Sequence, residues 1–349
     1  PTVFSKLGEL GFMGMRALES YGGLELDLVT YLLVLEELAW GDASVALGLA
    51  IHAGPVTDLL QRYGTEAQKE RYLTRVAAGE LLGAFALSEA GAGSDAGALA
   101  SAWEWRGSDR VLSGTKKWVT NGRLAGLVIV FARDSEKGRI SAFLLDPELH
   151  QYEIGRREVT MGLAASETVE LCLNQVPFGE ESLLGEEGQG FRYAMEAMEV
   201  GRLGIAAQAI GIARAAFEHA RDYAKERIQF GRPLSDFQAT RFKLAEMITR
   251  ITRVRALTLS AATLMEEGWD GGGECPSPGV LAAMAKLSAS EGAVWTTDEA
   301  VQIFGGYGYM RDYPVERLLR DAKGTEIYEG TNEIMRVVIS REVLREGQA

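Results

Sequence analysis

The stretch SAWEWRGSDRVLSGTKKWVTNG, residues 101–122, decides how the chain on either side of it is interpreted. Polar and apolar residues alternate along it, and turn-forming residues interrupt the alternation at 107–109 and at 121–122. Alternation with a period of two between such turns is typical of antiparallel strands with one buried face. We therefore predict a mostly antiparallel β-domain, a barrel or a sandwich. Further strand-like runs follow at 126–132, 140–146 and 169–178.

Before this region, residues 1–83 have the helical period. The apolar stretch 44–64 is interrupted by Pro55, and an amphipathic segment after it has a helix start at Thr65 and a stop at Gly79. These patterns predict an N-terminal helical domain.

The helical period returns after the β-region. Ser235 and Gln238 form a capping-box pattern, S-x-x-Q, ahead of one of the apolar stripes. Long helices connected in this way indicate a bundle. The four expected helices contain the stripe from Ala206 to Ala220, the stripe Leu244, Met247, Ile248, Ile251 and Val254, and residues 279–303 and 332–345. The predicted fold is thus α+β and multidomain, with a helical domain (1–83), a middle antiparallel β-barrel (84–183) and a C-terminal four-helix bundle (184–349).

The composition narrows the function classes. The chain has 349 residues, of which 47% are hydrophobic and 24% charged, so it can bury a large core. Its net charge of -13 disfavours binding to nucleic acid, which needs clustered Lys and Arg, and binding to anionic membranes. We see no secretory signal and no apolar run near the roughly 18 residues that span a bilayer. The chain begins at Pro1 rather than Met, and we expect residues upstream.

The cysteines and histidines give no metal signature. Cys172 and Cys275 are far apart and form no C-x-x-C, which indicates free thiols rather than a zinc site or a disulfide. His52, His150 and His219 lack any ligand spacing, so structural roles are favoured and no metal is expected.

The glycine-rich run SEAGAGSDAG, residues 88–97, invites a dinucleotide-binding interpretation that fails. Its spacing is wrong for G-x-G-x-x-G, and a strand-like segment follows where that motif needs a helix N-terminus for the pyrophosphate. On its own, the run fits a plain β-domain loop and a ligand-binding loop equally well.

Glu329 raises the central question about function. In TEIYEGTNEIM, residues 325–335, this acid lies between a tyrosine and a glycine just ahead of a predicted helix. A solvated turn residue and a catalytic base both fit that position, and without further information the turn residue is favoured.

Several stretches taken together resemble the acyl-CoA dehydrogenase family, and the resemblance covers almost the whole chain. One such stretch would be weak support, but five in the same order are specific. The stretches are FALSEAGAGSDAGAL (85–99), TKKWVTNG (115–122), ERIQFGRPLSDFQA (226–239), AVQIFGGYGYMRDYPVERLLRDAK (300–323) and IYEGTNEI (327–334). The family fold is a helical domain, a β-barrel and a helical bundle, in agreement with the periodicity.

The resemblance implies a role for Glu329 as the base that removes the α-proton of an acyl-CoA thioester. The β-hydrogen would then pass to N5 of FAD, and the product would be a trans-2-enoyl-CoA. Donors are needed where enolate charge develops, and the resemblance implies the Glu329 N–H and a ribityl hydroxyl. Some relatives carry the base elsewhere, at the position of Gly201, which cannot serve here.

The resemblance also implies the binding residues. Those expected to contact FAD are Phe85, Leu87, Ser88, Trp118, Thr120, Arg227, Gln229, Phe230, Gln238, Gln302, Gly305, Gly306, Thr331 and Asn332. Those expected to contact substrate are Ser94, Glu199, Arg202, Tyr328 and Gly330.

Structural alternatives exist for several of these residues. Trp118 could be an ordinary core aromatic, Arg227 a solvated helix-end charge and Gln238 only a capping partner. The GGYG run at 305–308 could be a helix C-cap and turn.

The resemblance further implies a homo-oligomer, expected to be a tetramer, in which neighbouring subunits share FAD. An electron-transfer flavoprotein would accept the electrons, in the bacterial cytoplasm or the mitochondrial matrix, within fatty-acid β-oxidation or amino-acid catabolism. The alternatives are an acyl-CoA oxidase of the same fold and a non-catalytic scaffold that binds FAD or acyl-CoA. The sequence leaves acyl-chain length and branching open.

Two positions depart from the family pattern. Ala90 replaces a proline in the glycine-rich loop, and Ala164 stands where an arginine is common after M-G-L. We expect the loop to be less rigid and a polar contact to be missing.

Overall fold

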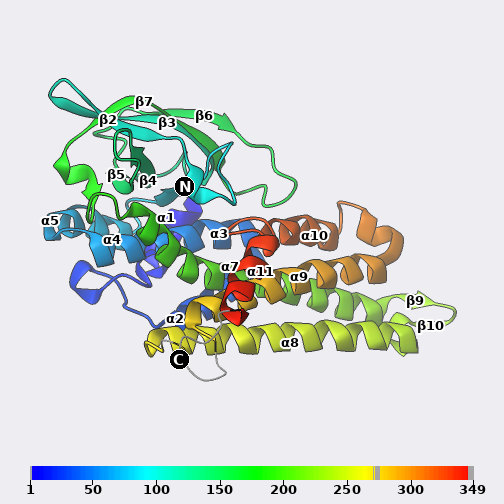
Figure 1. The fold of residues 1–349 in the computed structure, drawn as a ribbon. Coiled ribbons are helices and arrows are strands. Elements are labelled where there is room, and N and C mark those ends of the chain that lie inside the picture. Colours follow the sequence, from blue (N-terminus) through cyan, green and yellow to red (C-terminus); the bar gives the residue numbers. More distant parts are fainter. Residues whose placement is uncertain (1, 270, 272–275, 345–349) are drawn as a thin grey trace. The chain divides into compact units, whose positions relative to one another are not determined.

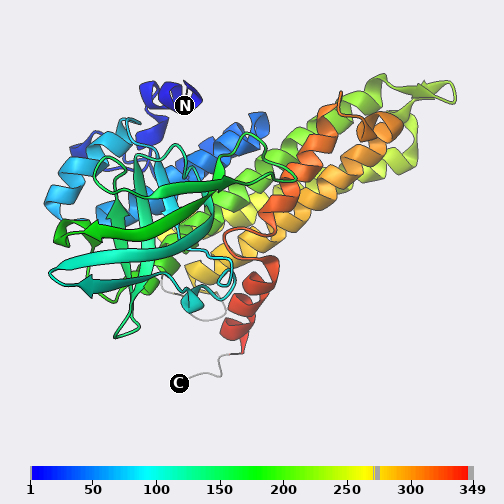
Figure 2. The same cartoon turned by 90° about the horizontal axis from the view of Figure 1, so that it is seen from above.

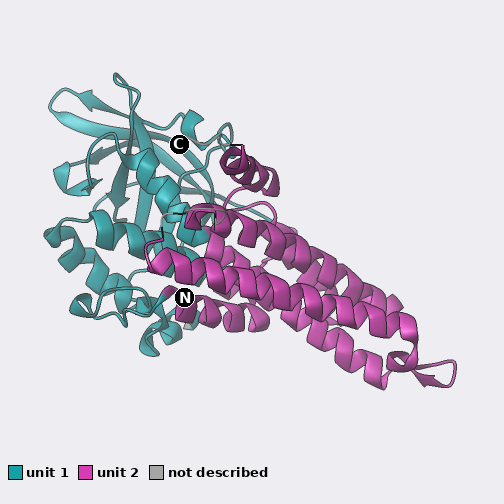
Figure 3. Cartoon of the chain, turned by 60° about the horizontal axis from the view of Figure 1, so that its bottom comes forward, with its two compact units in different colours: residues 1–27, 47–159, 165–201 teal, residues 28–46, 160–164, 202–349 magenta. Residues whose placement is uncertain are grey.

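The computed structural model describes residues 2–269, 271 and 276–344 (Figure 1). The chain divides into two compact units, which are described separately below (Figure 3). Unit 1 contains residues 1–27, 47–159 and 165–201, and unit 2 contains residues 28–46, 160–164 and 202–349. The three-domain boundaries expected from the sequence stay a prediction. Cys172 is a half-buried free thiol, and Cys275 lies outside the described residues.

The N-terminal part of the chain is helical, as predicted. Thr65 starts its segment with a capping box: its side chain accepts from the Gln68 N–H, and the Gln68 side chain accepts from the Thr65 N–H. Gly79 ends the segment with a φ of +75°, which only glycine adopts without strain. The elements are α1 (Thr2–Glu9), α3 (Ala43–Ile51), α4 (Thr57–Tyr63), α5 (Glu66–Gln68) and α6 (Thr74–Ala77), with π-helical turns at His52–Val56 and Lys69–Leu73.

Pro55 does not interrupt the second apolar stretch, contrary to the sequence-based expectation. The wide turn His52–Val56 takes up the proline, and the Thr57 N–H donates to the carbonyls of His52 and Gly54. Helix therefore runs from Ala43 to Tyr63, long and apolar enough by length and composition to cross a membrane. The expectation that no run reaches that length was wrong. The helix is 94% buried inside the structure, however, and a core helix passes the same test.

The middle region is a mostly antiparallel β-domain, as predicted. The strands lie in the order β6-β7-β3-β2-β4-β5-β8, while β1 pairs with β4, and the β1–β4 and β2–β4 pairs are parallel. Residues 107–108 make the tight β2–β3 turn, because Arg106 pairs with Asp109. The strands are β1 (Gly83–Ala86), β2 (Ala102–Arg106), β3 (Asp109–Thr120), β4 (Leu127–Asp134), β5 (Ile140–Leu145), β6 (Glu153–Arg157), β7 (Thr168–Phe178) and β8 (Leu183–Leu184).

A continuous apolar core holds the strands of this sheet together. Side chains from β1, β2, β3, β4, β5 and β7 form one buried cluster, in which Trp103, Phe143 and Phe178 contact one another edge to face. Aromatic pairs in this geometry add to the stability that comes from burial.

Unit 2 is a set of long helices (Figure 2). Its charged centre is Glu36, which is buried and paired with Arg214 and Arg255, so that α2, α7 and α8 are tied together. The elements are α2 (Leu28–Gly41), α7 (Gly190–Glu226, in unit 2 from residue 202), the hairpin β9 (Ile228–Gln229) and β10 (Arg232–Pro233), α8 (Gln238–Glu266), α9 (Pro278–Phe304), α10 (Pro314–Thr325) and α11 (Asn332–Val343).

Three details of the bundle differ from the prediction. Helix α10 was not expected, although it begins at Pro314, a residue favoured in a first turn. The Ser235–Gln238 capping box is wrong, because α8 begins at Gln238 after Phe237, with no side-chain cap. In the second apolar stripe, Ile248 is 42% exposed, whereas Met247, Ile251 and Val254 are buried.

Candidate functional site

The turn between α10 and α11 carries Glu329. It is closed by the Asn332 N–H, which donates to the Glu326 carbonyl at 3.0 Å. Within it, Glu329 and Gly330 both have left-handed backbone conformations, with φ of +53° and +91°. A non-glycine residue in this region is held there at a cost, and such strain gathers at functional sites. Thr331 then caps α11 by accepting from the Ile334 N–H.

The Glu329 carboxyl group has an unusual environment. Its Oε2 atom is buried and has no hydrogen-bond partner among the described residues. Burial raises the pKa of Glu329 to about 7, while the charges of Arg202 and Lys286 oppose this rise. The group can therefore exchange a proton near neutral pH, as a general base must.

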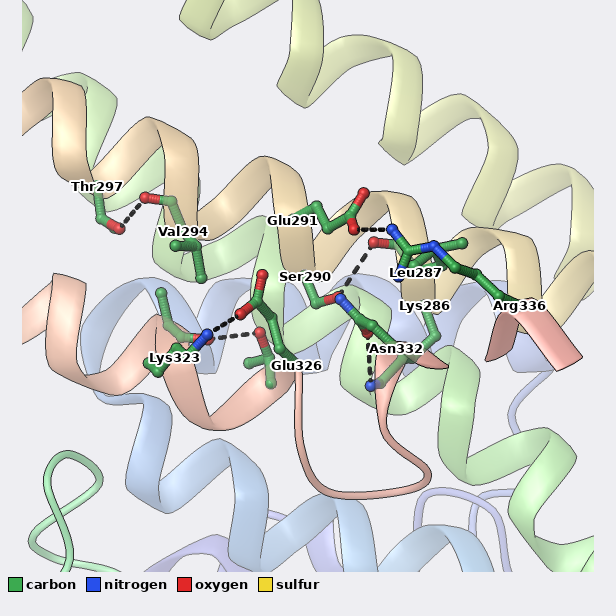
Figure 4. A network of polar contacts seen from close by, with 12 residues as sticks. Lys286, Leu287, Ser290, Glu291, Val294, Thr297, Lys323, Glu326, Asn332 and Arg336 are labelled. Carbon is green, nitrogen blue, oxygen red and sulfur yellow. Dashed lines mark hydrogen bonds and ion pairs between the residues drawn. The ribbon is translucent and has the colours of Figure 1, made fainter. Parts of the chain in front are cut away.

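A buried polar network lies behind this turn (Figure 4). Lys286 of α9 donates from Nζ to the Gly330 carbonyl at 2.7 Å and to Asn332 Oδ1 at 3.0 Å. Ser290 Oγ, one turn further along α9, lies 3.0 Å from the same Oδ1. The Asn332 side chain is thus engaged inside the unit, and its predicted contact with FAD stays a prediction.

Tyr328, on the other side of Glu329, is held by a second chain of hydrogen bonds. Its hydroxyl donates to Gln208 Oε1 at 2.9 Å, and Gln208 Nε2 donates to the Ala43 carbonyl at 2.7 Å. Gln208 is fully buried. The turn is therefore anchored on both sides of its acid.

In unit 1, a buried ion pair joins two of the segments expected to contact FAD. Lys116 Nζ of β3 lies 2.7 Å from Glu89 Oε1 and donates to the Leu87 carbonyl at 3.1 Å. Glu89 also accepts from the Ala100 and Ser101 N–H groups. The sequence analysis missed this pair. Lys116 and Lys117 are consecutive in a strand, so their side chains point to opposite faces. The sequence therefore indicated that one of the two lysines faces the core.

Trp118 lies at a bulge of β3 and is not a core aromatic. Its φ is +56° and its side chain is 54% exposed. Thr120 is half-buried two residues later. Asn121, also left-handed, donates from Nδ2 to the Gly48 and Gly83 carbonyls and so fixes the end of the strand.

The other predicted residues of unit 1 lie in several environments. Phe85 packs against Phe131 with ring centroids 5.0 Å apart, and Leu87 is buried. The half-buried Ser88 accepts at its carbonyl from the Lys117 N–H, so the loop runs beside β3. Ser94 is exposed, and Glu199 is half-buried in α7.

A separate group lies at the β9–β10 end of the bundle. The Arg227 guanidinium is 5.3 Å from the centroid of the Tyr307 ring, and Phe230 is left-handed and 95% exposed. The two views place this hairpin far from the start of α11 (Figures 1 and 2). One copy of unit 2 thus does not bring this group to Glu329. The predicted residues of this group are Arg227, Gln229, Phe230, Gln238, Gln302, Gly305 and Gly306, and all are exposed except the half-buried Arg227.

Among the described residues, no cluster of three or more His, Cys, Asp or Glu side chains could hold a metal ion. His52 has a structural role: burial lowers its pKa to about 4, and its Nδ1 accepts from the Gly83 N–H.

Comparison with known proteins identifies the class that this fold and turn define. Family profiles described as the N-terminal, middle and C-terminal domains of acyl-CoA dehydrogenase match residues 1–80, 84–176 and 188–344. The chain belongs to the acyl-CoA dehydrogenase family, and the predicted enzyme class is confirmed.

Individual relatives are similar over nearly the whole chain. An acyl-CoA dehydrogenase of Bacillus subtilis is 46% identical over 98% of this chain and 89% of its own length. The butyryl-CoA dehydrogenase structure from Megasphaera elsdenii is 43% identical with a TM-score of 0.94, covering 99% of this chain and 90% of that one. A chain in a structure of the electron transferring flavoprotein of Acidaminococcus fermentans is 44% identical with a TM-score of 0.93, covering 99% and 90%.

Proposed function

We propose that this enzyme uses FAD to dehydrogenate a short-chain acyl-CoA thioester to the trans-2-enoyl-CoA. The observation that carries the proposal is Glu329: a buried carboxyl atom without a partner, on a strained turn, with a pKa of about 7. The butyryl-CoA dehydrogenase, 43% identical over nearly the whole chain, supports the short chain length.

Glu329 acts as the base in this proposal. The α-hydrogen beside a thioester is a very weak acid, so its removal needs an ionised carboxylate in a dry site together with donors for the developing enolate charge. None of the backbone hydrogen bonds of the described chain uses the Glu329 N–H, which leaves it available for the thioester oxygen. Glu199, Arg202, Tyr328, Gly330 and Ser94 are the proposed substrate contacts.

FAD, when bound, accepts the hydrogen that leaves the β-carbon. The residues present fit such a cofactor: Trp118 offers a largely exposed indole, and Thr331 begins a helix whose N-terminus favours a phosphate. Arg227 supplies a fork of donors suited to phosphate oxygens. The proposed FAD contacts remain those expected from the sequence, Asn332 included, although its Oδ1 atom also accepts from Lys286 inside the protein.

The exposed group at the β9–β10 hairpin supports an oligomer. In the proposal this group grips the FAD of a neighbouring copy in a homotetramer. An electron-transfer flavoprotein is the proposed acceptor, and the structure that contains one similar chain is described as concerning such a protein. The proposed pathway is fatty-acid β-oxidation or amino-acid catabolism.

The test compares wild type with Glu329→Gln on a panel of acyl-CoA substrates, under anaerobic stopped flow. We expect the variant to bind FAD and acyl-CoA but to reduce the flavin about 10²–10⁴-fold more slowly. Glu316→Gln, an acid of α10 paired with Arg320, is the control and is expected to keep the wild-type rate.

Further outcomes separate the alternatives. Unchanged flavin reduction in Glu329→Gln contradicts the proposal. Rapid reoxidation by air, rather than by an electron-transfer flavoprotein, favours an oxidase. A colourless protein that cannot take up FAD favours a scaffold.

A further inference from the structure

The position of Lys286 is energetically unfavourable for a charged side chain. Its side chain is fully buried in α9, where an ammonium group loses its hydration. A neutral donor would bond the Gly330 carbonyl and Asn332 Oδ1 without that cost. The presence of a charge there calls for an explanation beyond packing.

We propose that Lys286 is a positioning residue for the base: it anchors the turn that carries Glu329 and supplies a positive charge facing the Glu329 carboxylate. This inference rests on the proposed function. It adds a residue that none of the recognised sequence stretches contains.

The anchoring role follows from the hydrogen bonds. The left-handed conformation of Glu329 is unfavourable for a residue other than glycine and persists only where the surroundings hold it. Lys286 Nζ bonds both the Gly330 carbonyl and Asn332 Oδ1, while the Asn332 N–H closes the turn on Glu326. One ammonium group therefore fixes the backbone directly after Glu329, and its contact with Asn332 is seen in Figure 4.

The electrostatic role follows from the charged groups around the ammonium. Three carboxylates, Glu326 at the end of α10, Glu329 in the turn and Glu333 of α11, are close enough to raise the pKa of Lys286, and Arg202 of α7 opposes them. Burial lowers the pKa of Lys286 to about 8, so most of the group is charged at pH 7. Its charge favours the ionised form of Glu329, and its loss would raise the pKa of that carboxyl further.

Two variants separate the two roles. Lys286→Met removes both the charge and the donor, whereas Lys286→Gln removes the charge and keeps a donor. Arg336→Met is the matched control, because it breaks an exposed ion pair with Glu291 between the same helices, α9 and α11.

The first measurement is the pKa of Glu329 by infrared difference spectroscopy, with the carboxyl band assigned by its loss in Glu329→Gln. We expect this pKa to rise by about one pH unit in both lysine variants and to stay unchanged in Arg336→Met. A merely structural role of Lys286 would leave the pKa in place.

The second measurement is the pH profile of flavin reduction in the holoenzyme. In Lys286→Gln, we expect about fivefold slower reduction at pH 7 and recovery to near the wild-type rate at alkaline pH, where Glu329 is ionised. In Lys286→Met, the rate stays low at every pH because the turn is no longer anchored. If Lys286→Met fails to fold, Lys286→Gln decides the test.

The proposal is overturned if folded, FAD-containing Lys286→Gln keeps both the wild-type Glu329 pKa and the wild-type pH profile. Failure of the proposed function has a different signature, since Glu329→Gln would then reduce flavin normally while the pKa rise in the lysine variants could still be observed.

Discussion

At Glu329, a carboxyl group that ionises readily in water is placed where ionisation is opposed. The protein encloses Oε2, leaves it unbonded within the described chain, and sets positive charge on Arg202 and Lys286 nearby. The result is a group balanced between its two forms near pH 7, which suits a base that must take up a proton and later release it.

The rate of flavin reduction should follow this balance. The reaction needs the carboxylate, so with a saturating short acyl-CoA we expect the rate to rise with pH and level off above about 7. Stopped-flow measurements between pH 5.5 and about 9 test this. A rate that is flat across that window would contradict a base with a raised pKa.

The same residue should lower stability at neutral pH. Between pH 4.5 and about 7 the folded protein holds the Glu329 proton more tightly than the unfolded chain, so the free energy of unfolding falls as pH rises through that window. Glu329→Gln lacks this fall and should be more stable at pH 7.5, by at most about 3 kcal/mol. Denaturant unfolding of both proteins at pH 4.5 and 7.5 measures the effect. If the free energies of unfolding of variant and wild type differ equally at the two pH values, the effect is excluded.

At the scale of elements, the Lys116–Glu89 pair connects β3 to the glycine-rich loop. The base of this loop, next to Ala90, is held by the ion pair and by two backbone donors to Glu89. The loop's shape therefore depends on a charge inside the β-domain.

Lys116→Met should destabilise the protein by about 3–5 kcal/mol, because it leaves a buried carboxylate without its cation. Thermal melts and FAD retention measure the change, and FAD should be lost more readily as the loop loosens. Lys137→Met, which breaks an exposed pair with Glu187, is the control and should change stability by less than about 0.5 kcal/mol. Equal effects of the two substitutions would contradict the role given to the buried pair.

Sequence patterns predicted these elements unevenly, for physical reasons. Periodicity identifies faces, so the buried stripe of α7 and the long strands of the β-domain were predicted, whereas the short strands β6 and β8 were not. Lys116 was missed because a long cation inside a strand looks like a solvent-facing residue until its partner is known. Pro55 wrongly predicted a break in the Ala43–Tyr63 helix. The wide turn that accommodates the proline cannot be recognised from the amino-acid composition. Ser235 was wrongly predicted to cap α8, because a capping-box pattern in the sequence does not determine the residue at which a helix begins.

At the scale of the whole molecule, the sequence motifs identified the family and implied that neighbouring subunits share the cofactor. Within unit 2, the motifs around Arg227 and Glu329 lie at separate places (Figure 2). Their separation depends on helix lengths and directions, which the motifs do not contain. The sharing of FAD between subunits stays a prediction.

Arg227→Ala should weaken FAD binding about tenfold or more, since a charge-assisted bond to phosphate is lost. If FAD is shared between copies, its loss should also shift the assembly toward smaller species. FAD titration and light scattering, with and without added FAD, measure both effects. Arg221→Ala, which removes an exposed partner of Asp222 in the same helix, should change neither. A monomeric wild-type protein that holds FAD tightly would refute the sharing.

The wide turn at Pro55 has a consequence for how this chain can change. A wide turn of this kind takes up one residue more than an α-helical turn does, because its hydrogen bonds reach one residue further back. Leu59 and Leu60, both fully buried, therefore keep the facing that a regular helix one residue shorter would give them. Deleting one of residues 52–56 should restore a regular helix and leave both leucines inside, whereas a deletion after Val56 would rotate every later side chain by about 100°. The turn is thus a place where the length of this chain can change without exposing the core that follows.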